Sequence, residues 1–282
     1  MFLFFISFTI GCNINGNVNE DESGKNSTGV WPPAGLYFMK WESYHGYFIG
    51  EEPFIQLSLV QVHFGNKQEP TPSYQKYYLL SDNGEFVASS TGFQPGSSGR
   101  QYSLYTLGLK LQKMTPGIYI IDKLKVVDSN NHDEIYPIGK WVIDIREGTQ
   151  TDDMILGKRT FASGFFDWYN VEITNKTKEV AYIKKLIFQL DQKSFDTTLK
   201  TYEDFHMQKR LDDSPYLIPG SSKAFVFEFN NSEKLGSHKF ISLRPFLSYE
   251  IKNQNKLMIL PTAIYSPSLN DEEIRKLVQN LK

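Results

Sequence analysis

Few residues in this chain of 282 amino acids have the type and spacing that chemistry requires. The chain holds one cysteine, Cys12, and five histidines that stand singly, at His45, His63, His132, His206 and His238. No two histidines have the close spacing of a zinc motif. The sequence also has no Gly-x-Ser-x-Gly elbow, no Ser-x-x-Lys with its companion motifs and no glycine-rich phosphate loop that opens a helix. It therefore predicts no catalytic residue, no metal site and no cofactor.

Acidic residues occur in adjacent pairs and in one alternating run. The pairs are Glu51-Glu52, Asp152-Asp153 and Asp212-Asp213. Adjacent residues of a strand point to opposite faces, so these pairs are poor candidates for concerted acid-base catalysis. Asp128, Asn130, His132 and Glu134 have the types of a calcium loop, but Asp133 stands where that loop needs glycine. We interpret this run as a solvated hairpin turn.

Aromatic residues cluster in two places where they could stack on a ligand. The first is Trp41-Glu42-Ser43-Tyr44-His45-Gly46-Tyr47-Phe48, and the second surrounds Trp168. Interpreted as loops, these clusters would offer a surface for a glycan or a peptide. The candidate ligand-binding residues are therefore Trp41, Tyr44, His45, Tyr47 and Trp168. Packing in a core or at a domain interface is the competing interpretation, and we prefer it.

Cys12 directly follows an apolar opening segment, residues 1–11. At about 1.5 Å per residue this segment is too short to cross a hydrocarbon core of about 30 Å as a helix, and it has the length of a signal-peptide core. The residues Thr9-Ile10-Gly11-Cys12 resemble the lipobox of bacterial lipoproteins. The resemblance implies cleavage before Cys12, a lipid on its thiol, and anchoring on the extracytoplasmic face of a bacterial cell membrane, of the Gram-positive type. An ordinary cleaved signal and a buried first strand are the alternatives.

Residues 12–29 are expected to form the lipidated cysteine and a tether. The 17 residues after Cys12 are mostly Asn, Gly, Ser, Asp and Glu, with almost no apolar content. Such a composition favours disorder. A flexible chain of this length reaches about 20–25 Å.

The pattern from residue 30 to residue 147 is typical of strands joined by turns. Residues 53–62 alternate, with Ile55, Leu57 and Leu59 set against Gln56 and Ser58. Asn83-Gly84 is a strong hairpin signal between two further strands. Strands are also expected near residues 36–41, 102–111, 118–127 and 140–145. We expect one β-sandwich domain here.

A second strand-rich unit is expected over residues 148–266. Its strands are expected near residues 165–173, 180–190, 223–229, 240–247 and 257–264. Residues 195–213 could form either a long loop or a short helix. The layout resembles the tandem immunoglobulin-like or fibronectin-type-III-like modules of bacterial surface proteins, and this implies two antiparallel β-sandwiches. Residues 267–282 are expected to form an amphipathic helix with Asn270 as N-cap and Glu273 as its capping-box partner. We expect its apolar face to dock on the second domain.

Composition narrows the classes of function that remain. A net charge of −2 gives no electrostatic case for nucleic acid. The all-β pattern and the segment around Cys12 together favour a membrane-anchored, non-catalytic envelope lipoprotein whose partners are the lipid bilayer, through Cys12, and an envelope or extracellular protein or cell-wall glycan. A binder of surface glycan, peptidoglycan or solute is the first alternative. An envelope hydrolase with a spatially assembled site is the second.

Overall fold

The computed structural model describes residues 30–63, 73–82, 84–157, 162–163, 166–190, 197–203, 206–207, 209–211, 215–230, 240–267 and 269–281. The predicted leader, Cys12 and the predicted tether lie outside the described residues, as does His238. Within the described residues the regular structure is β-strand, apart from one helix, α1 (Asp271–Gln279). The predicted all-β class with a C-terminal helix is confirmed.

The strands of the N-terminal half are β1 (Gly35–Phe38), β2 (Trp41–Phe48), β3 (Phe54–Val62), β4 (Lys76–Ser81), β5 (Gly84–Ser98), β6 (Tyr102–Leu111), β7 (Gly117–Val127) and β8 (Asp133–Arg146). Those that follow are β9 (Met154–Leu156), β10 (Ala162–Ser163), β11 (Trp168–Asn175), β12 (Ala181–Ile187), β13 (Thr197–Tyr202), β14 (Tyr216–Leu217), β15 (Ser222–Phe229), β16 (Phe240–Arg244), β17 (Phe246–Ile251), β18 (Gln254–Ile259) and β19 (Ala263–Tyr265). The segment left as a loop or a helix thus contains strand β13.

Strand β3 shows how the sequence pattern becomes structure. Ile55, Leu57 and Leu59 are fully buried, whereas Gln56 and Ser58 are only half-buried. This period-2 alternation confirms the prediction for residues 53–62. Burying each large aliphatic side chain contributes about 1.5–3 kcal/mol, so one face of the strand fixes its register against β6.

The first sheet has eleven strands, in the order β1-β3-β6-β5-β4-β7-β8-β2-β16-β19-β10. The long strand β5 pairs with β4 through residues 84–88 and with β6 through residues 88–98. The sheet therefore folds over on itself around one core, here called core 1. Strands β4 and β5 meet at the predicted Asn-Gly hairpin, with Ser81 opposite Gly84; Asn83 itself lies outside the described residues.

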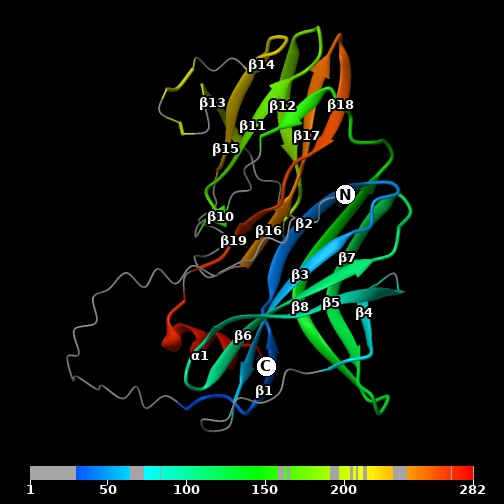
Figure 1. Ribbon diagram of the computed structural model, residues 1–282, viewed down its shortest axis with the longest axis vertical. Coiled ribbons are helices and arrows are strands. Elements are labelled where there is room, and N and C mark those ends of the chain that lie inside the picture. Colours follow the sequence, from blue (N-terminus) through cyan, green and yellow to red (C-terminus); the bar gives the residue numbers. More distant parts are fainter. Residues whose placement is uncertain are drawn as a thin grey trace, which may run out of the picture.

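Two smaller sheets complete the second half. Sheet B has the order β13-β15-β11-β9, and sheet C has the order β14-β12-β17-β18. Their inward-facing side chains form a second core, core 2, whose largest fully buried members are Tyr249, Tyr265, Phe225, Phe227 and Phe246. The strands of sheets B and C lie in the upper part of Figure 1, and β1 and α1 lie toward the bottom.

Strands β2, β8 and β16 join the two halves. Strand β2 pairs in parallel with β8 on one side and with β16 on the other. The pairing at this junction is therefore parallel, whereas the sequence analysis expects antiparallel sandwiches. Because β16 comes from residues 240–244, the eleven-stranded sheet crosses residue 147, where the sequence analysis places the domain boundary.

The three shared strands serve both cores through the alternation of their side chains. In β2, Trp41 and Tyr47 pack into core 1, whereas Tyr44 and Phe48 pack into core 2. In β8, Trp141 belongs to core 1 and Val142 to core 2, and in β16 Phe240 belongs to core 1 while Ile241 and Leu243 belong to core 2. Successive residues of a strand point to opposite faces, so one layer of sheet separates and supports both cores.

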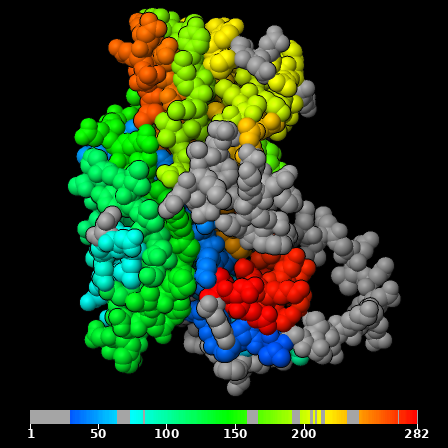
Figure 2. Space-filling view, turned by 180° about the vertical axis from the view of Figure 1, so that it is seen from behind, coloured from blue at the N-terminus to red at the C-terminus, as the bar shows by residue number. Residues whose placement is uncertain are grey.

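Helix α1 docks on core 1, which corrects the expectation that it docks on the second domain. Its buried residues Ile274 and Val278 belong to core 1, and Tyr102 of β6 donates a hydrogen bond of 2.7 Å from its hydroxyl to Asp271. Figure 2 shows the helix, in red, against the N-terminal strands, in blue. The predicted capping box is confirmed, because the Asn270 side chain accepts from Glu273 and the Glu273 side chain accepts from Asn270.

Among the described residues, no helix has the length and apolar content needed to cross a membrane.

Candidate functional site

The aromatic cluster of residues 41–48 forms a buried strand, not a loop. Trp41, Tyr44, His45 and Tyr47 are each exposed by 4 % or less. The hypothesis that these four residues form an exposed stacking surface is therefore wrong, and the alternative of packing at a core and interface describes them correctly. The reason is topological: β2 lies between β8 and β16 within the sheet, and core 1 covers one of its faces while core 2 covers the other.

Trp168 does not join the other four predicted residues. It begins β11 and is half-buried, and its carbonyl oxygen accepts a hydrogen bond of 2.8 Å from the hydroxyl of Tyr265. The predicted site residues thus fall into two separate places. Four of them lie at the junction of the two cores, where Tyr44 on one face of the shared strands and His45 with Tyr47 on the other face take part in two polar networks.

The network on the core 2 face is charged. The Tyr44 hydroxyl donates to Asp144 Oδ2 at 2.5 Å, and Arg146 donates to the same oxygen from Nη2 at 2.7 Å. The Arg146 guanidinium also lies 4.8 Å from the ring centroid of Phe246. Burial, followed by the Asp144 charge, raises the pKa of Tyr44, so its phenol stays protonated and acts as a donor.

The network on the core 1 face centres on His45. Its Nε2 lies 2.8 Å from Ser242 Oγ on β16, and its Nδ1 lies 3.4 Å from the Tyr47 hydroxyl. The Tyr47 hydroxyl in turn donates to the carbonyl oxygen of Phe54 at 3.0 Å. Burial, followed by the charge of Arg244, lowers the pKa of His45 to about 3. His45 is therefore neutral at physiological pH.

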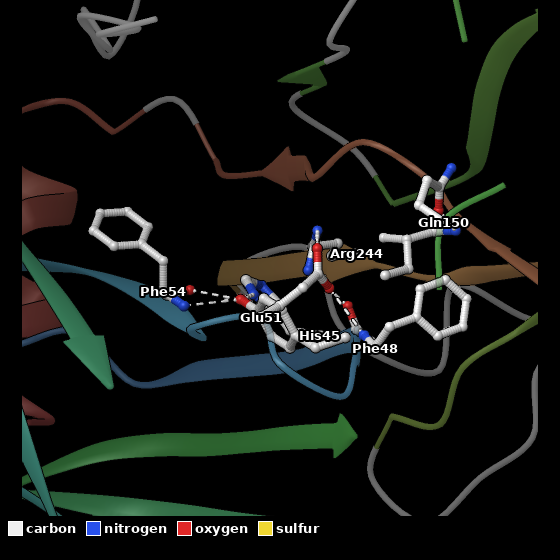
Figure 3. A network of polar contacts seen from close by, with 9 residues as sticks. His45, Phe48, Glu51, Phe54, Gln150 and Arg244 are labelled. Atoms are coloured by element: carbon white, nitrogen blue, oxygen red, sulfur yellow. Dashed lines mark hydrogen bonds and ion pairs between the residues drawn. The ribbon is translucent and has the colours of Figure 1, made fainter. Parts of the chain in front are cut away.

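Arg244 of β16 connects the His45 network to the turn between β2 and β3. Figure 3 shows His45, Phe48, Glu51, Phe54 and Arg244 around the turn between β2 and β3. Arg244 donates to the Gly46 carbonyl oxygen at 2.8 Å, lies 3.4 Å from Glu51, and has its guanidinium carbon 4.2 Å from the ring centroid of Tyr47. Glu51 accepts from the backbone N–H of Phe48 at 2.9 Å. The arrangement fixes the turn against the second half of the chain.

The His45–Ser242 pair has the atoms of a base and a nucleophile but not their environment. Both residues are buried, at 4 % and 3 % exposure, so a substrate has no approach to the serine oxygen. A general base works best when its pKa lies near the operating pH, and a histidine with a pKa of about 3 is a weak base at pH 7. The geometry of this pair supports a structural role.

The sequence did not identify Asp144, Arg146, Ser242 and Arg244 as partners of the aromatic cluster. A weak signal was present for the first two, since the charged residues at positions 144 and 146 follow the apolar run Trp141-Val142-Ile143. The pairing with β16 carried no local signal, because it joins residues about 200 positions apart.

The acidic run near residue 130 forms a hairpin turn. Asp128 accepts from the backbone N–H groups of Asn130 at 2.7 Å and His132 at 2.9 Å, and this turn connects β7 with β8. The interpretation as a turn is confirmed. Within the part of the chain that the structure describes, no group of three or more His, Cys, Asp or Glu side chains could hold a metal ion.

No family model matches this chain, and no curated protein matches it at a significant level. Among solved structures, the fibronectin(III)-like modules of Clostridium thermocellum CbhA match with a TM-score of 0.25 and 8 % identity, over 83 % of this chain and 95 % of that chain. The D00-D0 domain of intimin matches with a TM-score of 0.23 and 9 % identity, over 82 % and 98 %. The tandem Ig repeats of Dlar match with a TM-score of 0.23 and 10 % identity, over 83 % and 98 %.

These structures include modules of the class that the strand pattern resembles. Their TM-scores are too low to carry an argument about function, and the all-β class stands on the strands of the chain itself.

Proposed function

We propose that this protein is a non-catalytic lipoprotein of a bacterial cell envelope, anchored through Cys12 and presenting its β-rich body to an envelope or extracellular partner. The observation that carries the proposal is the apolar segment 1–11, whose last residue, Gly11, directly precedes Cys12, together with the 17 residues of mostly polar sequence after Cys12. A lipid on Cys12 would hold the protein at the membrane, and the polar segment would place the body in front of it.

The entry of the chain into the body supports a defined orientation. The carbonyl oxygen of Val30 accepts a hydrogen bond of 2.8 Å from Gln279 of α1, and the ring of Trp31 stacks on Tyr102 at 5.5 Å. The chain therefore enters the body beside α1, whereas sheet C lies at the opposite end (Figure 1). Anchoring at Cys12 would keep the α1 end nearer the membrane and direct sheet C away from it.

The anchor is tested by expressing the full chain in a Gram-positive host and analysing the mature amino terminus by intact-protein and peptide mass spectrometry. We expect wild type to sediment with membranes and to carry a diacylglyceryl adduct on Cys12 as its first residue. Cys12→Ala should lose the adduct and pass to the medium or remain as an uncleaved precursor. Asn13→Ala, one position later, is the matched control and should behave as wild type.

Wild-type protein without lipid on Cys12 would overturn the anchored localisation. Cleavage elsewhere with a free thiol at Cys12 would instead establish an ordinary cleaved signal, one of the two alternatives that the sequence analysis gives for residues 1–11.

A further inference from the structure

Three large side chains that are normally buried lie exposed together on sheet C. They are Tyr182 of β12 at 44 % exposure, Tyr216 of β14 at 39 % and Ile218 just after β14 at 52 %. Tyr182 and Tyr216 are paired directly across the two strands, with ring centroids 6.3 Å apart. We call these three residues, with Lys184 and Lys223, the tip patch.

Each tyrosine of the tip patch carries a lysine ammonium group on one side. Lys223 Nζ lies 4.6 Å from the ring centroid of Tyr216 and donates to its carbonyl oxygen at 2.9 Å. Lys184 Nζ lies 5.7 Å from the ring centroid of Tyr182. Burial lowers the pKa of Lys223, which means that its charge is partly desolvated. A carboxylate placed beside it would find a positive charge with reduced screening.

The surroundings of the tip patch are strongly basic. Residues 176–187, 215–223 and 249–256 contain seven lysines and two glutamates, and with Asp153, which pairs with Lys256, they leave an excess of four lysines, although the whole chain has a net charge of −2. Lys184, Lys252 and Lys256 are paired with Glu250, Glu179 and Asp153. The other four are Lys176, Lys178, Lys185 and Lys223, and none of them has a carboxylate within ion-pair distance among the described residues.

A buried asparagine makes the backbone under the patch rigid. Asn175 is fully buried, and its Nδ2 donates to the carbonyl oxygens of Glu179 at 2.8 Å and Leu217 at 2.9 Å. Its Oδ1 accepts from the backbone N–H and the hydroxyl of Thr177 at 2.9 and 2.8 Å. One side chain thus binds the turn at 176–179 to β14. A preordered surface loses little conformational entropy on binding.

The free edge of β14 is unsuited to strand addition. β14 has two residues, Pro215 precedes it, Ile218-Pro219 follows it, and the Tyr216 carbonyl oxygen already accepts from Lys223. Proline and short length are the usual means of closing a sheet edge. A partner would therefore contact the side chains of the patch and not extend the sheet.

The combination of aromatic, aliphatic and cationic groups defines the kind of partner. Exposed tyrosine and isoleucine offer apolar contact area of the type that concentrates binding energy in protein interfaces. A phosphate-rich polymer would use the lysines and leave Ile218 and the tyrosine rings without a role. A membrane surface is disfavoured because sheet C lies at the end away from α1, where the chain enters the body.

We infer that the tip patch is the docking surface for an acidic segment of a protein partner, with carboxylates against Lys223 and the other lysines of the region that have no paired carboxylate, and an apolar or aromatic side chain against Tyr182, Tyr216 and Ile218. The inference rests on the proposed binding function, and the exclusion of a membrane surface also depends on the proposed anchor at Cys12.

The exposed face of strands β4, β5, β7 and β8 provides a matched comparison. It also carries exposed aliphatic residues, Val87, Ile118 and Ile135, at 55–58 %. Its lysines are accompanied by carboxylates, since Lys125 pairs with Glu85 at 2.6 Å and Lys123 lies 3.9 Å from Asp122. Substitutions on this face control for a general loss of exposed apolar or basic side chains.

The test uses the full chain with Cys12→Ala, so that its outcome is independent of lipidation. The probe is an immobilised random copolymer of glutamate and tyrosine, measured beside polyglutamate, polyphosphate and phosphatidylglycerol vesicles by biolayer interferometry at about 50 mM salt. We expect the copolymer to bind most tightly. Lys223→Glu should weaken that binding about tenfold or more, and Lys123→Glu should change it less than about twofold.

The tyrosines separate a docking surface from a simple basic patch. Tyr182→Ala with Tyr216→Ala should weaken copolymer binding about tenfold and leave polyglutamate binding within about twofold, whereas Ile118→Ala with Ile135→Ala should change neither. Tyr182→Phe with Tyr216→Phe keeps the rings and the fold and should retain most of the binding. Absence of copolymer binding, equal effects of patch and control variants, or tighter binding to polyphosphate or vesicles would each overturn the inference.

Discussion

Core 1 and core 2 differ in which parts of the chain enclose them. Core 1 is enclosed by one sheet that folds over through β5 and is covered by α1, and all but a few of its buried residues come from positions 38–145. Core 2 is assembled from two four-stranded sheets and also takes Tyr44, Phe48 and Val142 from strands of the first half. The second half therefore completes its core with residues that the first half has already positioned.

The two faces of β2 also differ, because one carries a neutral hydrogen-bond network and the other a charged one. Toward core 1, the neutral His45 makes hydrogen bonds with Ser242 and Tyr47. Toward core 2, Asp144 forms an ion pair with Arg146 and accepts a hydrogen bond from the Tyr44 hydroxyl. Hydrogen-bonded neutral groups tolerate burial at low cost, while an ion pair needs its partners in place. The charged network is thus the more fragile side of the junction.

The largest effect should come from Gly139, where β8 passes β2. Its φ is +82°, and a Cβ atom there would lie closer than 3.0 Å to the backbone N and O of Trp41. We expect Gly139→Ala to lower the free energy of unfolding by about 3–5 kcal/mol, because the clash is with backbone that cannot move aside.

Denaturant unfolding of Gly92→Ala is the control for that variant. Gly92 also has a positive φ, of +87°, but a Cβ atom added there would meet nothing within 4 Å. Its cost should be about 1 kcal/mol, from backbone strain alone. If the two variants lost the same free energy of unfolding, the close approach of β8 to β2 would not be the cause of the Gly139→Ala effect.

The charged network should give the next largest effect. Asp144→Ala leaves Arg146 and the Tyr44 hydroxyl without their acceptor, and we expect a loss of about 2–3 kcal/mol, below the range for fully buried pairs because Arg146 is partly exposed. Glu85→Ala, which removes the exposed pair with Lys125, should cost at most about 0.5–1 kcal/mol. Chemical denaturation of both variants makes the comparison.

The buried neutral His45 should make the free energy of unfolding depend on pH. The folded protein keeps His45 neutral down to its pKa of about 3, whereas a histidine in the unfolded chain binds a proton near pH 6.5. Between these values the unfolded state binds more protons, so stability falls as the pH falls. From pH 7 to pH 5 this group alone should remove about 2 kcal/mol.

Replacement of His45 by Gln should flatten that part of the stability profile. His132→Gln, which replaces a histidine whose side chain is 80 % exposed, is measured beside it. A His45→Gln profile as steep as that of wild type would contradict the assignment of a buried neutral imidazole.

The smallest of these effects belongs to the helix cap. Asn270→Ala removes the side-chain acceptor of the Glu273 N–H and should cost about 1 kcal/mol, whereas Asn270→Ser keeps a good cap and most of the stability. Thermal unfolding should show a shift of a few degrees. A larger loss for Asn270→Ser than for Asn270→Ala would contradict the capping role.

The sequence was informative wherever structure is local. The alternation of Ile55, Leu57 and Leu59, the Asn83-Gly84 turn and the Asn270–Glu273 box each predict an element from its own residues. The parallel pairing of β2 with β16 depends on contacts between distant parts of the chain, and β2 was consequently misread as a loop. The same contacts bury Trp41, Tyr44, His45 and Tyr47, so the stacking hypothesis failed with the loop assignment. The exposed pair Tyr182 and Tyr216 also depends on a strand pairing that no local pattern shows.

The central claim is that β2, β8 and β16 join the two cores into one cooperative body. Differential scanning calorimetry of the full chain with Cys12→Ala, beside the same chain carrying Asp144→Ala, tests it directly. We predict a single transition whose calorimetric and van't Hoff enthalpies agree, shifted as a whole to lower temperature by the substitution. Two separate transitions in the parent chain, of which Asp144→Ala moves only one, would contradict the claim.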